Sequence, residues 1–319
     1  MLSAGAGLVC CITFIWFSAP DLALTQLIAE VVTTVLMLLG LRWLPLRKET
    51  AQPLGSRIRR LGRRSRDLFI AGSAGCGMAA LAWAMMTRTF PQSISPFFLE
   101  RALTEGGGTN VVNVMLVDFR GFDTFGEITV FGVAALIVHA LLRRARLAPE
   151  KVMPGPPVKL PVPADLAQLM FPLTLTVSVF LFLRGHNAPG GGFIAGLVLA
   201  VPLLIQYVIQ GAASVESRFG FDYVRCIGVG LMVAGISGAA SLLYGVEFLT
   251  SGHLDLEVPF VGTVPLASAM GFDTGVYLVV FGGAMLVLSM LGTIKPSRTR
   301  VAQLGVIDPD QRSTRTGDS

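Results

Sequence analysis

Long uncharged runs of apolar residues are the feature of this sequence that most constrains its fold. Several of these runs exceed ~18 residues, the length that an α-helix needs to cross a bilayer core of about 30 Å. Charged residues make up only 14% of the chain and the mean hydropathy is +0.68, whereas a soluble domain carries roughly a quarter charged residues. The sequence therefore predicts an all-α polytopic membrane protein, because such segments are too long and too apolar for barrel strands.

The apolar runs predict about eight crossings of the membrane. The expected segments are 1–17, 22–43, 68–86, 123–142, 164–183, 192–210, 226–246 and 273–294. Basic residues concentrate in alternate loops, above all at 42–66, where Glu49 is the single acid. Because loops rich in Lys and Arg stay in the cytoplasm, we expect the N and C termini on the cytoplasmic side of a bacterial inner membrane. The same clustering indicates topology and contact with anionic lipid, and nothing in the sequence indicates nucleic-acid binding.

A Pro-rich stretch at 148–163 is the clearest boundary in the chain and predicts a cytoplasmic linker. It separates a four-helix region, 1–147, from a second four-helix region, 164–294. The polar residues 295–319 predict a disordered cytoplasmic tail. The chain starts apolar without a basic leader, so we expect a transmembrane helix there and not a cleaved signal peptide.

The cysteines predict no cofactor and no metal site. They lie in apolar segments without CxxC or CxxH spacing, which zinc or an iron–sulfur cluster would require. We interpret them as small buried hydrophobic residues. They are Cys10, Cys11, Cys76 and Cys226.

Glu30 lies in the middle of the segment 22–43. Helical spacing places Gln26, Thr33 and Thr34 on the same face as Glu30. A carboxylate at mid-bilayer depth costs several kcal/mol unless it is paired or protonated, so such residues commonly mark ion or proton paths. We therefore predict a proton or cation path along this face. The alternative is a protonated Glu30 that only hydrogen-bonds a neighbouring helix.

Four charged residues, Asp118, Arg120, Asp123 and Glu127, lead into the apolar run that ends near residue 142. If the helix is continuous, helical spacing places Arg120 and Glu127 on one face, together with Asp123 or Thr124. Two acids four residues apart repel when both are ionised, which suits a group that binds and releases a proton. The alternative is that Asp123 or Thr124 caps the helix and Glu127 is a first-turn acid favoured by the helix dipole.

The tetrapeptide GFDT occurs at 121–124 and again at 271–274, each time at the start of a predicted crossing. In the second copy Tyr277 occupies the position that corresponds to Glu127. The shared residues, including Asp273, are therefore interpreted as helix-entry residues, and Glu127 is the better candidate for chemistry. We interpret the segment just before it, 110–122, as an amphipathic stretch at the outer interface.

Further polar residues admit two interpretations. His139, in the same helix as Glu127, is either a proton relay or a buried neutral histidine bonded to backbone. His186 in an external loop is either a turn or intersubunit contact, or part of an ion entrance. Glu247 is interpreted as interfacial, and Asp21, which follows Pro20, as a helix cap.

Two sets of motifs carry a family resemblance. SAPDLALTQLIAEVVTTVL and GGGTNVVNVMLVDFRGFDTFGEITVFG resemble the C-terminal membrane portion of the large MrpA-type (MnhA-type) chain of Mrp (Mnh) sodium/proton antiporters, whose modules also occur in membrane-bound hydrogenases. RGHNAPGGGFIAGLVLA and GFDTGVYLVVFGG resemble the MnhB-type chain of the same antiporters. The resemblance covers about residues 1–294 and suggests an MnhA-type tail fused to an MnhB-type chain.

The resemblance implies that the chain is one component of a multisubunit antiporter that exchanges Na⁺ for H⁺ and supports pH homeostasis. It matches the family's membrane carboxylates to Glu30 and Glu127. The antiporter-like part of the MnhA-type chain is absent here, so the resemblance implies partners: that part, and further subunits of the C to G type. Alternatives are a membrane module of a hydrogenase or of a redox-driven pump like complex I, or an assembly scaffold. In none of these interpretations is the chain itself an enzyme.

Overall fold

The computed structural model describes six stretches of the chain: 2–41, 55–89, 92–146, 161–210, 212–258 and 262–293. Two compact units are distinguished. One comprises Met1–Leu44 with Phe97–Ser319, and the other comprises Pro45–Pro96.

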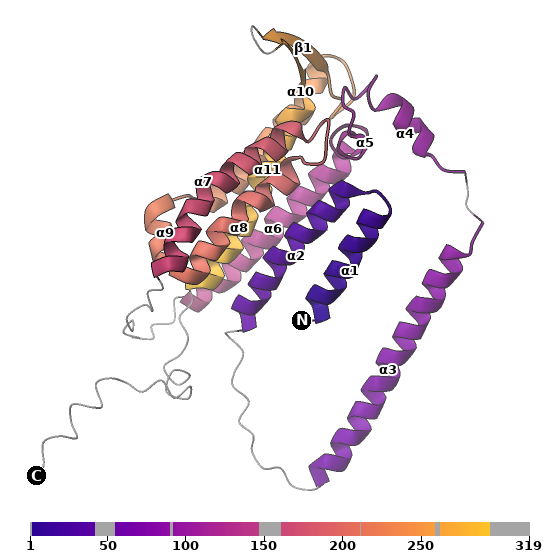
Figure 1. The fold of residues 1–319 in the computed structure, drawn as a ribbon, viewed down its shortest axis with the longest axis vertical. Coiled ribbons are helices and arrows are strands. Elements are labelled where there is room, and N and C mark those ends of the chain that lie inside the picture. Colours follow the sequence, from indigo (N-terminus) through magenta and orange to yellow (C-terminus); the bar gives the residue numbers. More distant parts are fainter. Residues whose placement is uncertain are drawn as a thin grey trace, which may run out of the picture. The chain divides into compact units, whose positions relative to one another are not determined.

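The larger unit is a bundle of helices with one small sheet (Figure 1). Its long helices are α1 (Leu2–Trp16), α2 (Pro20–Leu41), α6 (Gly121–Arg146), α7 (Pro161–Arg184), α8 (Gly192–Gln210), α10 (Tyr223–Leu243) and α11 (Ala269–Thr293). Its shorter elements are α4 (Ser95–Arg101, which begins at the unit boundary), α5 (Val111–Val114), the π-helix η1 (Met115–Phe119), α9 (Ala212–Phe219), β1 (His253–Val258) and β2 (Gly262–Ala267).

Helix α11 is the centre of this bundle. It packs against α10, α8, α6 and α2, and 72% of its most apolar stretch is buried. The core residues Val279, Val280 and Leu288 have no exposed surface. Small residues allow the closest crossing, where a Cβ on Gly230 of α10 would lie 2.8 Å from the backbone oxygen of Gly275 in α11. Such small-residue contacts are the usual way in which membrane helices approach each other.

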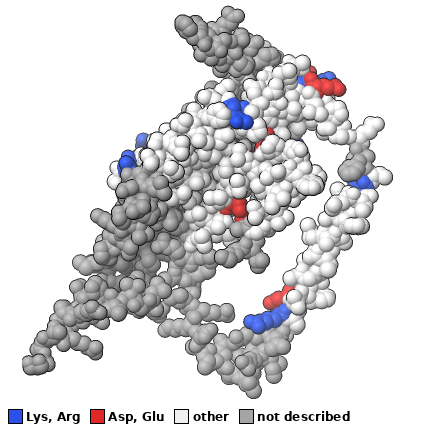
Figure 2. Space-filling view, viewed as in Figure 1, with Lys and Arg blue, Asp and Glu red and all other residues white. Residues whose placement is uncertain are grey.

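Few charged residues lie on the face of this unit shown in Figure 2, and many of the unit's exposed side chains are large and apolar. Leu243 is 87% exposed, and Leu183 and Phe180 are each 57% exposed. Apolar side chains that point outward all around a bundle suit a lipid environment and not water.

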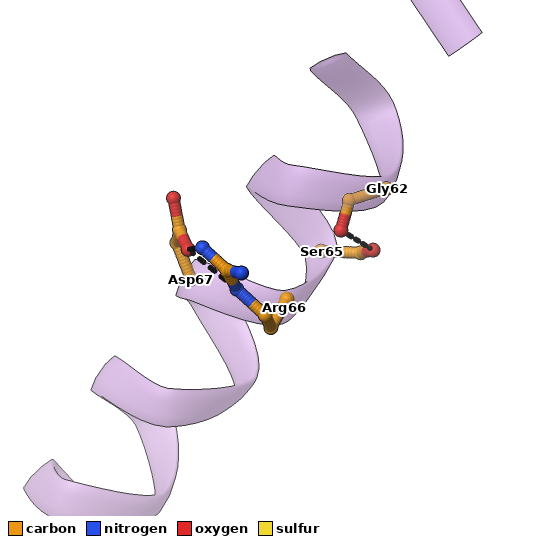
Figure 3. Close-up of polar contacts among 4 residues, drawn as sticks. All are labelled: Gly62, Ser65, Arg66 and Asp67. Carbon is orange, nitrogen blue, oxygen red and sulfur yellow. Dashed lines mark hydrogen bonds and ion pairs between the residues drawn. The ribbon is translucent and has the colours of Figure 1, made fainter. Parts of the chain in front are cut away.

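In the smaller unit, helix α3 runs over Gly55–Met86. The sequence predicts a loop up to residue 66, which is wrong from Gly55 onward. Arg and Leu are good helix formers, so the helix extends through the basic residues before the apolar segment. At this end Ser65 donates to the Gly62 oxygen at 3.0 Å and Arg66 pairs with Asp67 at 2.9 Å (Figure 3). Because both partners are exposed, this ion pair contributes only about 0–1 kcal/mol.

The helical fold class is confirmed, and five described helices are long and apolar enough to cross a membrane. They correspond to the predicted segments that begin at residues 22, 68, 123, 226 and 273. Three shorter apolar helices, Gly5–Trp16, Leu169–Arg184 and Gly192–Tyr207, fall in the remaining predicted segments. The full set of about eight crossings and the placement of both termini stay predictions.

The loops contain structure that the sequence analysis does not predict. Helix α9 lies between the expected segments 192–210 and 226–246, and the antiparallel hairpin β1–β2 lies between the expected segments 226–246 and 273–294. The proposed four-part division of the chain stays a prediction. Of the expected linker 148–163, residues 148–160 lie outside the described residues and 161–163 form the start of α7; the tail 295–319 also lies outside the described residues.

Candidate functional site

A cavity of about 280 Å³ lies inside the larger unit, where α2, α6, α8 and α11 come together near one end of the bundle. It contains the carboxylates of Asp21, Glu127 and Asp273, and no lysine or arginine is among its described lining residues. We call this the acidic cavity. Its wall is completed by Leu22, Thr25, Val112, Asn113, Leu116, Val117, Thr124, Gly190, Gly191, Gly192, Phe193, Ile194 and Val276.

Asp21 holds the loop between α7 and α8. Its Oδ1 accepts hydrogen bonds from the backbone nitrogen of Gly190 at 3.0 Å and from Asn110 Nδ2 at 3.4 Å. Arg184 at the start of this loop interacts with it electrostatically. The interpretation of Asp21 as a cap of its own helix is wrong, because α2 begins at Pro20 and the carboxylate bonds a loop far along the chain.

Asp273 has a corresponding role on the other side of the same loop. Helix α11 begins at Ala269, so Asp273 lies in its second turn and does not cap it, contrary to the sequence interpretation. Its Oδ2 accepts the backbone N–H of Gly192, the first residue of α8, at 2.8 Å. The first N–H groups of a helix have no partner within the helix, so Asp273 satisfies one for its neighbour. The side chain is 8% exposed.

Gly191 lies between Gly190, which is bonded to Asp21, and Gly192, which is bonded to Asp273. Its φ is +101°, a backbone conformation that residues with a side chain rarely adopt. Asn110 secures the rest of the loop by donating from Nδ2 to the oxygens of Gly185, at 3.0 Å, and Ala188, at 3.1 Å. The ring of His186 lies 2.8 Å from the Gly106 oxygen through Nε2. His186 is thus a contact between loops of the chain itself.

Glu127 is an exposed residue of α6 that lines the acidic cavity, and the chain bends just before this helix. Residues 115–119 form a π-helix, and Arg120 leaves helical geometry with φ −127° and ψ 30°. Thr124 bridges the bend by donating from Oγ1 to the Leu116 oxygen at 2.6 Å. We call this bend the Arg120 break.

The condition of a continuous helix is not met at Arg120, whereas Asp123, Thr124 and Glu127 lie together in α6. Asp123 forms an ion pair with Arg120 and lies in the first turn of α6, so it is not the N-cap. Asp118 accepts from the Ser251 backbone nitrogen at 2.9 Å, and Asn113, Val114 and Val117 in this stretch are buried. One face of the stretch is buried and the other, with Val112, Leu116 and Phe122, is exposed, so its expected place at the outer interface stays a prediction.

Glu30 lies in a separate cavity of about 330 Å³ between α1 and α2. Its walls are mostly apolar and include Thr34, and the carboxylate packs against Gly7. The Oε1 atom of Glu30 is buried and makes no hydrogen bond to any described residue. The structure therefore does not bring Glu30 and Glu127 into one cavity.

The remaining predicted path residues lie away from both carboxylates or turn outward. Thr33 is exposed and donates to the backbone oxygens of Ala29 and Glu30, and Gln26 is half-buried but lines neither cavity. His139 is half-buried in α6, and its Nδ1 makes no hydrogen bond within the described chain. Glu247 is exposed on the loop after α10, and its interfacial placement stays a prediction.

Asp21 and Asp273 are visible in the sequence, but only as candidate caps, and sequence reasoning misses Asn110 and Gly190 as site residues. A signal is present, because the run Gly190–Gly191–Gly192 indicates that other groups approach the backbone closely. Which groups approach it cannot be inferred from spacing, since Asp21 precedes the run by 169 residues.

The fold and the site together define a multi-pass helical membrane protein in which two buried acids, Asp21 and Asp273, and the exposed Glu127 line one cavity. Comparison with protein families adds three matches. The family model described as "Domain related to MnhB subunit of Na+/H+ antiporter" matches residues 162–286. The models MbhD and MbhE, which describe the D and E components of MBH, match residues 1–46 and 62–157.

Individual proteins agree with these matches. The probable K(+)/H(+) antiporter A/B chain of Rhizobium meliloti (strain 1021) is 49% identical over 315 residues, covering 91% of this chain and 31% of the relative. The B chain of the Na(+)/H(+) antiporter of Alkalihalophilus pseudofirmus is 40% identical over 116 residues, covering 36% of this chain and 81% of the relative. A chain in the structure of the Mrp complex from Dietzia sp. DQ12-45-1b superposes with a TM-score of 0.76 and 32% identity, covering 93% of this chain and 32% of that one.

The chain belongs to the family of Mrp-type antiporter subunits, with an MbhD–MbhE region followed by an MnhB-type domain. This family contains components of transporters and not enzymes. The chain spans about a third of the length of the Rhizobium relative, at 31%. The acidic cavity combines both regions, because Asp21 and Glu127 come from the MbhD–MbhE region and Asp273 from the MnhB-type domain.

Proposed function

We propose that this chain takes part in the exchange of a monovalent cation for protons across the membrane, and that the acidic cavity is part of the ion path. The supporting observation is three carboxylates around one cavity of about 280 Å³ without a lysine or arginine in its described lining. Ionised groups inside a membrane protein are costly unless a proton or a counter-ion neutralises them. A proton and a cation that compete for the same carboxylates would be exchanged for one another.

The cavity supports distinct roles for its acids. Asp21 and Asp273 each use one oxygen for a backbone N–H, which fixes their orientation. Glu127 makes no hydrogen bond or ion pair to a described residue and is the one exposed acid of the three, so we assign it the proton and cation exchange step. Side-chain and backbone oxygens of the wall, such as those of Asn113 and Thr124, are suitable additional ligands for an alkali cation.

We include Glu30 in the same proposal as a second site that binds a proton along the path. A buried carboxylate oxygen without a partner in the described chain, in a mostly apolar cavity, suits a group that holds a proton in transit. Thr34 shares this cavity, while Gln26, Thr33, His139 and Asp123 stay predicted contributors. Asp123 is the weakest of these, because it is bound to Arg120.

We further propose that the chain works in a bacterial inner membrane with other antiporter subunits, including the antiporter-like portion of an MnhA-type chain and further subunits of the C to G type. The exchanged cation is Na⁺ or K⁺, since the relatives are named for both. About eight crossings with cytoplasmic termini are part of the same proposal.

The direct test uses inverted membrane vesicles that contain the assembled complex, in which cation addition dissipates an imposed pH gradient. We expect Glu127→Gln to abolish the dissipation by both Na⁺ and K⁺ while the complex still assembles. Glu247→Gln is the matched control, because Glu247 is exposed and lies outside the acidic cavity. Normal exchange in the Glu127→Gln complex would contradict a role of the acidic cavity in the ion path. The scaffold interpretation, in which the chain serves assembly, would then remain.

One observation favours a second candidate, a module of a redox-driven ion pump. The MBH models match both stretches of the N-terminal region, 1–46 and 62–157. In that case the purified complex would contain iron–sulfur proteins and exchange ions only during electron transfer. Iron analysis of the purified complex, together with exchange measured without an electron donor, distinguishes the two candidates.

A further inference from the structure

Leu249 is in an unusual conformation for its residue type. Its φ is +68°, and Ser18 is the only other non-glycine residue with positive φ in the described chain. Side chains with a branched or bulky stem disfavour this region, and such conformations persist where the surroundings hold them, commonly at functional sites. Leu249 is also buried, with 7% of its surface exposed. A strained, buried leucine in a connecting segment therefore calls for a structural reason.

The contacts of Leu249 join two parts of the fold. Its backbone nitrogen donates to the Gly238 oxygen of α10 at 3.2 Å. Its side chain covers Gly121, the first residue of α6, where an added Cβ would lie 3.5 Å from the leucine Cβ. Gly238 also accommodates this side chain, because a Cβ there would lie 2.9 Å from Leu249 Cδ2.

The neighbours of Leu249 contact both sides of the Arg120 break. Ser251 donates its backbone N–H to Asp118 Oδ1, before the break, at 2.9 Å. Phe248 packs edge-on against Phe125, after the break, with ring centroids 6.4 Å apart. We call residues 248–251 the clamp segment. It comes from the MnhB-type domain, whereas the break belongs to the MbhD–MbhE region.

The break decides which side chains face the acidic cavity. Val112, Asn113, Leu116 and Val117 line the cavity from before it, and Thr124 and Glu127 line the cavity from after it. A change in the angle between the π-helix and α6 would move Glu127, which lies in the second turn of α6, relative to Asp273 on α11. The clamp segment contacts both sides of this angle, as does α11, which packs against the π-helix and against α6.

We propose that Leu249 is a positioning residue. Its packing against Gly121 fixes the clamp segment to the Arg120 break, and this keeps Glu127 at the acidic cavity. It acts through Gly121 and does not contact the exchanged ions. In this positive-φ conformation the side chain lies against both Gly121 and Gly238. The transport part of this inference rests on the proposed function, whereas the positional part does not.

The test combines transport with a positional readout in the full assembled complex. Leu249→Ala removes this packing, Leu249→Gly removes the packing and the strain, and Leu249→Met keeps a side chain of similar volume. Leu243→Ala, at a residue that is 87% exposed, is the matched control. The positional readout is the rate at which a methanethiosulfonate reagent modifies Glu127→Cys in a background whose native cysteines are replaced by alanine.

We expect Leu249→Ala and Leu249→Gly to change the modification rate at position 127 several-fold and to raise the KM for the cation several-fold in the assembled complex. Leu249→Met and Leu243→Ala should leave both values near those of the parent. If Leu249→Gly does not assemble, Leu249→Ala decides the question. Unchanged modification and KM in the assembled alanine variant would overturn the proposal. A parent complex that exchanges no ions would refute the proposed function, while the modification rates would still decide the positional claim.

Discussion

The hydrogen bond from Gly192 to Asp273 gives the most quantitative prediction. Gly192 is buried at the start of α8, and its N–H donates to Asp273 Oδ2 at 2.8 Å. Removing the acceptor with Asp273→Ala leaves this N–H unsatisfied, which costs about 1–3 kcal/mol. Asp273→Asn keeps an acceptor oxygen and removes a poorly solvated charge, so its stability should lie within about 1 kcal/mol of the parent.

Thermal unfolding of the detergent-purified complex measures this difference. A fluorogenic thiol reagent reports when buried cysteines such as Cys11 become accessible. A loss of about 1–3 kcal/mol corresponds to a fall in Tm of roughly 2–12 °C for a domain of this size. We expect that fall for Asp273→Ala, a shift of only a few degrees for Asp273→Asn, and none for the exposed control Glu247→Ala.

Two results would refute the reasoning about Asp273. An alanine variant as stable as the parent would mean that the hydrogen bond contributes nothing. An asparagine variant as unstable as the alanine variant would mean that the charge and not the acceptor stabilises α8. Exchange measured in the same preparations separates stability from function, because we expect both variants to lose exchange if the charge of Asp273 is needed in the cavity.

Two further predictions concern the walls of the acidic cavity. Gly191→Ala should destabilise the complex by at least about 1–2 kcal/mol, because alanine disfavours positive φ and its Cβ would lie 2.7 Å from Asn113 Nδ2; an unchanged Tm would contradict this. Thr124→Val removes the 2.6 Å bond to the Leu116 oxygen with little change of shape, and should lower stability by about 1 kcal/mol and reduce exchange. A Thr124→Val complex with the parent's Tm and exchange rate would show that the Arg120 break does not depend on this bond.

Much of the fold is predictable because hydrophobic length and loop charge depend on local sequence. The prediction of 192–210 coincides with α8, since an apolar run begins there directly after a glycine-rich loop. The hairpin also has a visible signal, because HLDLEV alternates apolar and polar residues in the manner of a strand. That alternation lies between two predicted crossings, 226–246 and 273–294, so the sequence analysis places no element there.

The site is predictable only in part, because its geometry depends on contacts between distant segments. Comparison of the two GFDT copies distinguishes Glu127, and Glu127 does line the acidic cavity. The π-helix is not predictable, since the hydrogen bond from the Arg120 nitrogen to the Met115 oxygen has no clear sequence signature. Asp273 accepts a hydrogen bond from the first residue of α8, 81 residues earlier in the chain. Its role therefore cannot be inferred from its position in α11.

Labelling of Glu127 by a carbodiimide that reacts with protonated carboxyl groups tests the central claim most directly. The assembled complex would be treated at fixed pH with rising Na⁺ or K⁺, with choline as the matched salt, and modification at Glu127 followed by mass spectrometry. Competition between proton and cation in the acidic cavity predicts that the transported cation, but not choline, progressively protects Glu127. Labelling that is equally fast at every Na⁺ and K⁺ concentration would contradict the claim that Glu127 exchanges a proton for a cation.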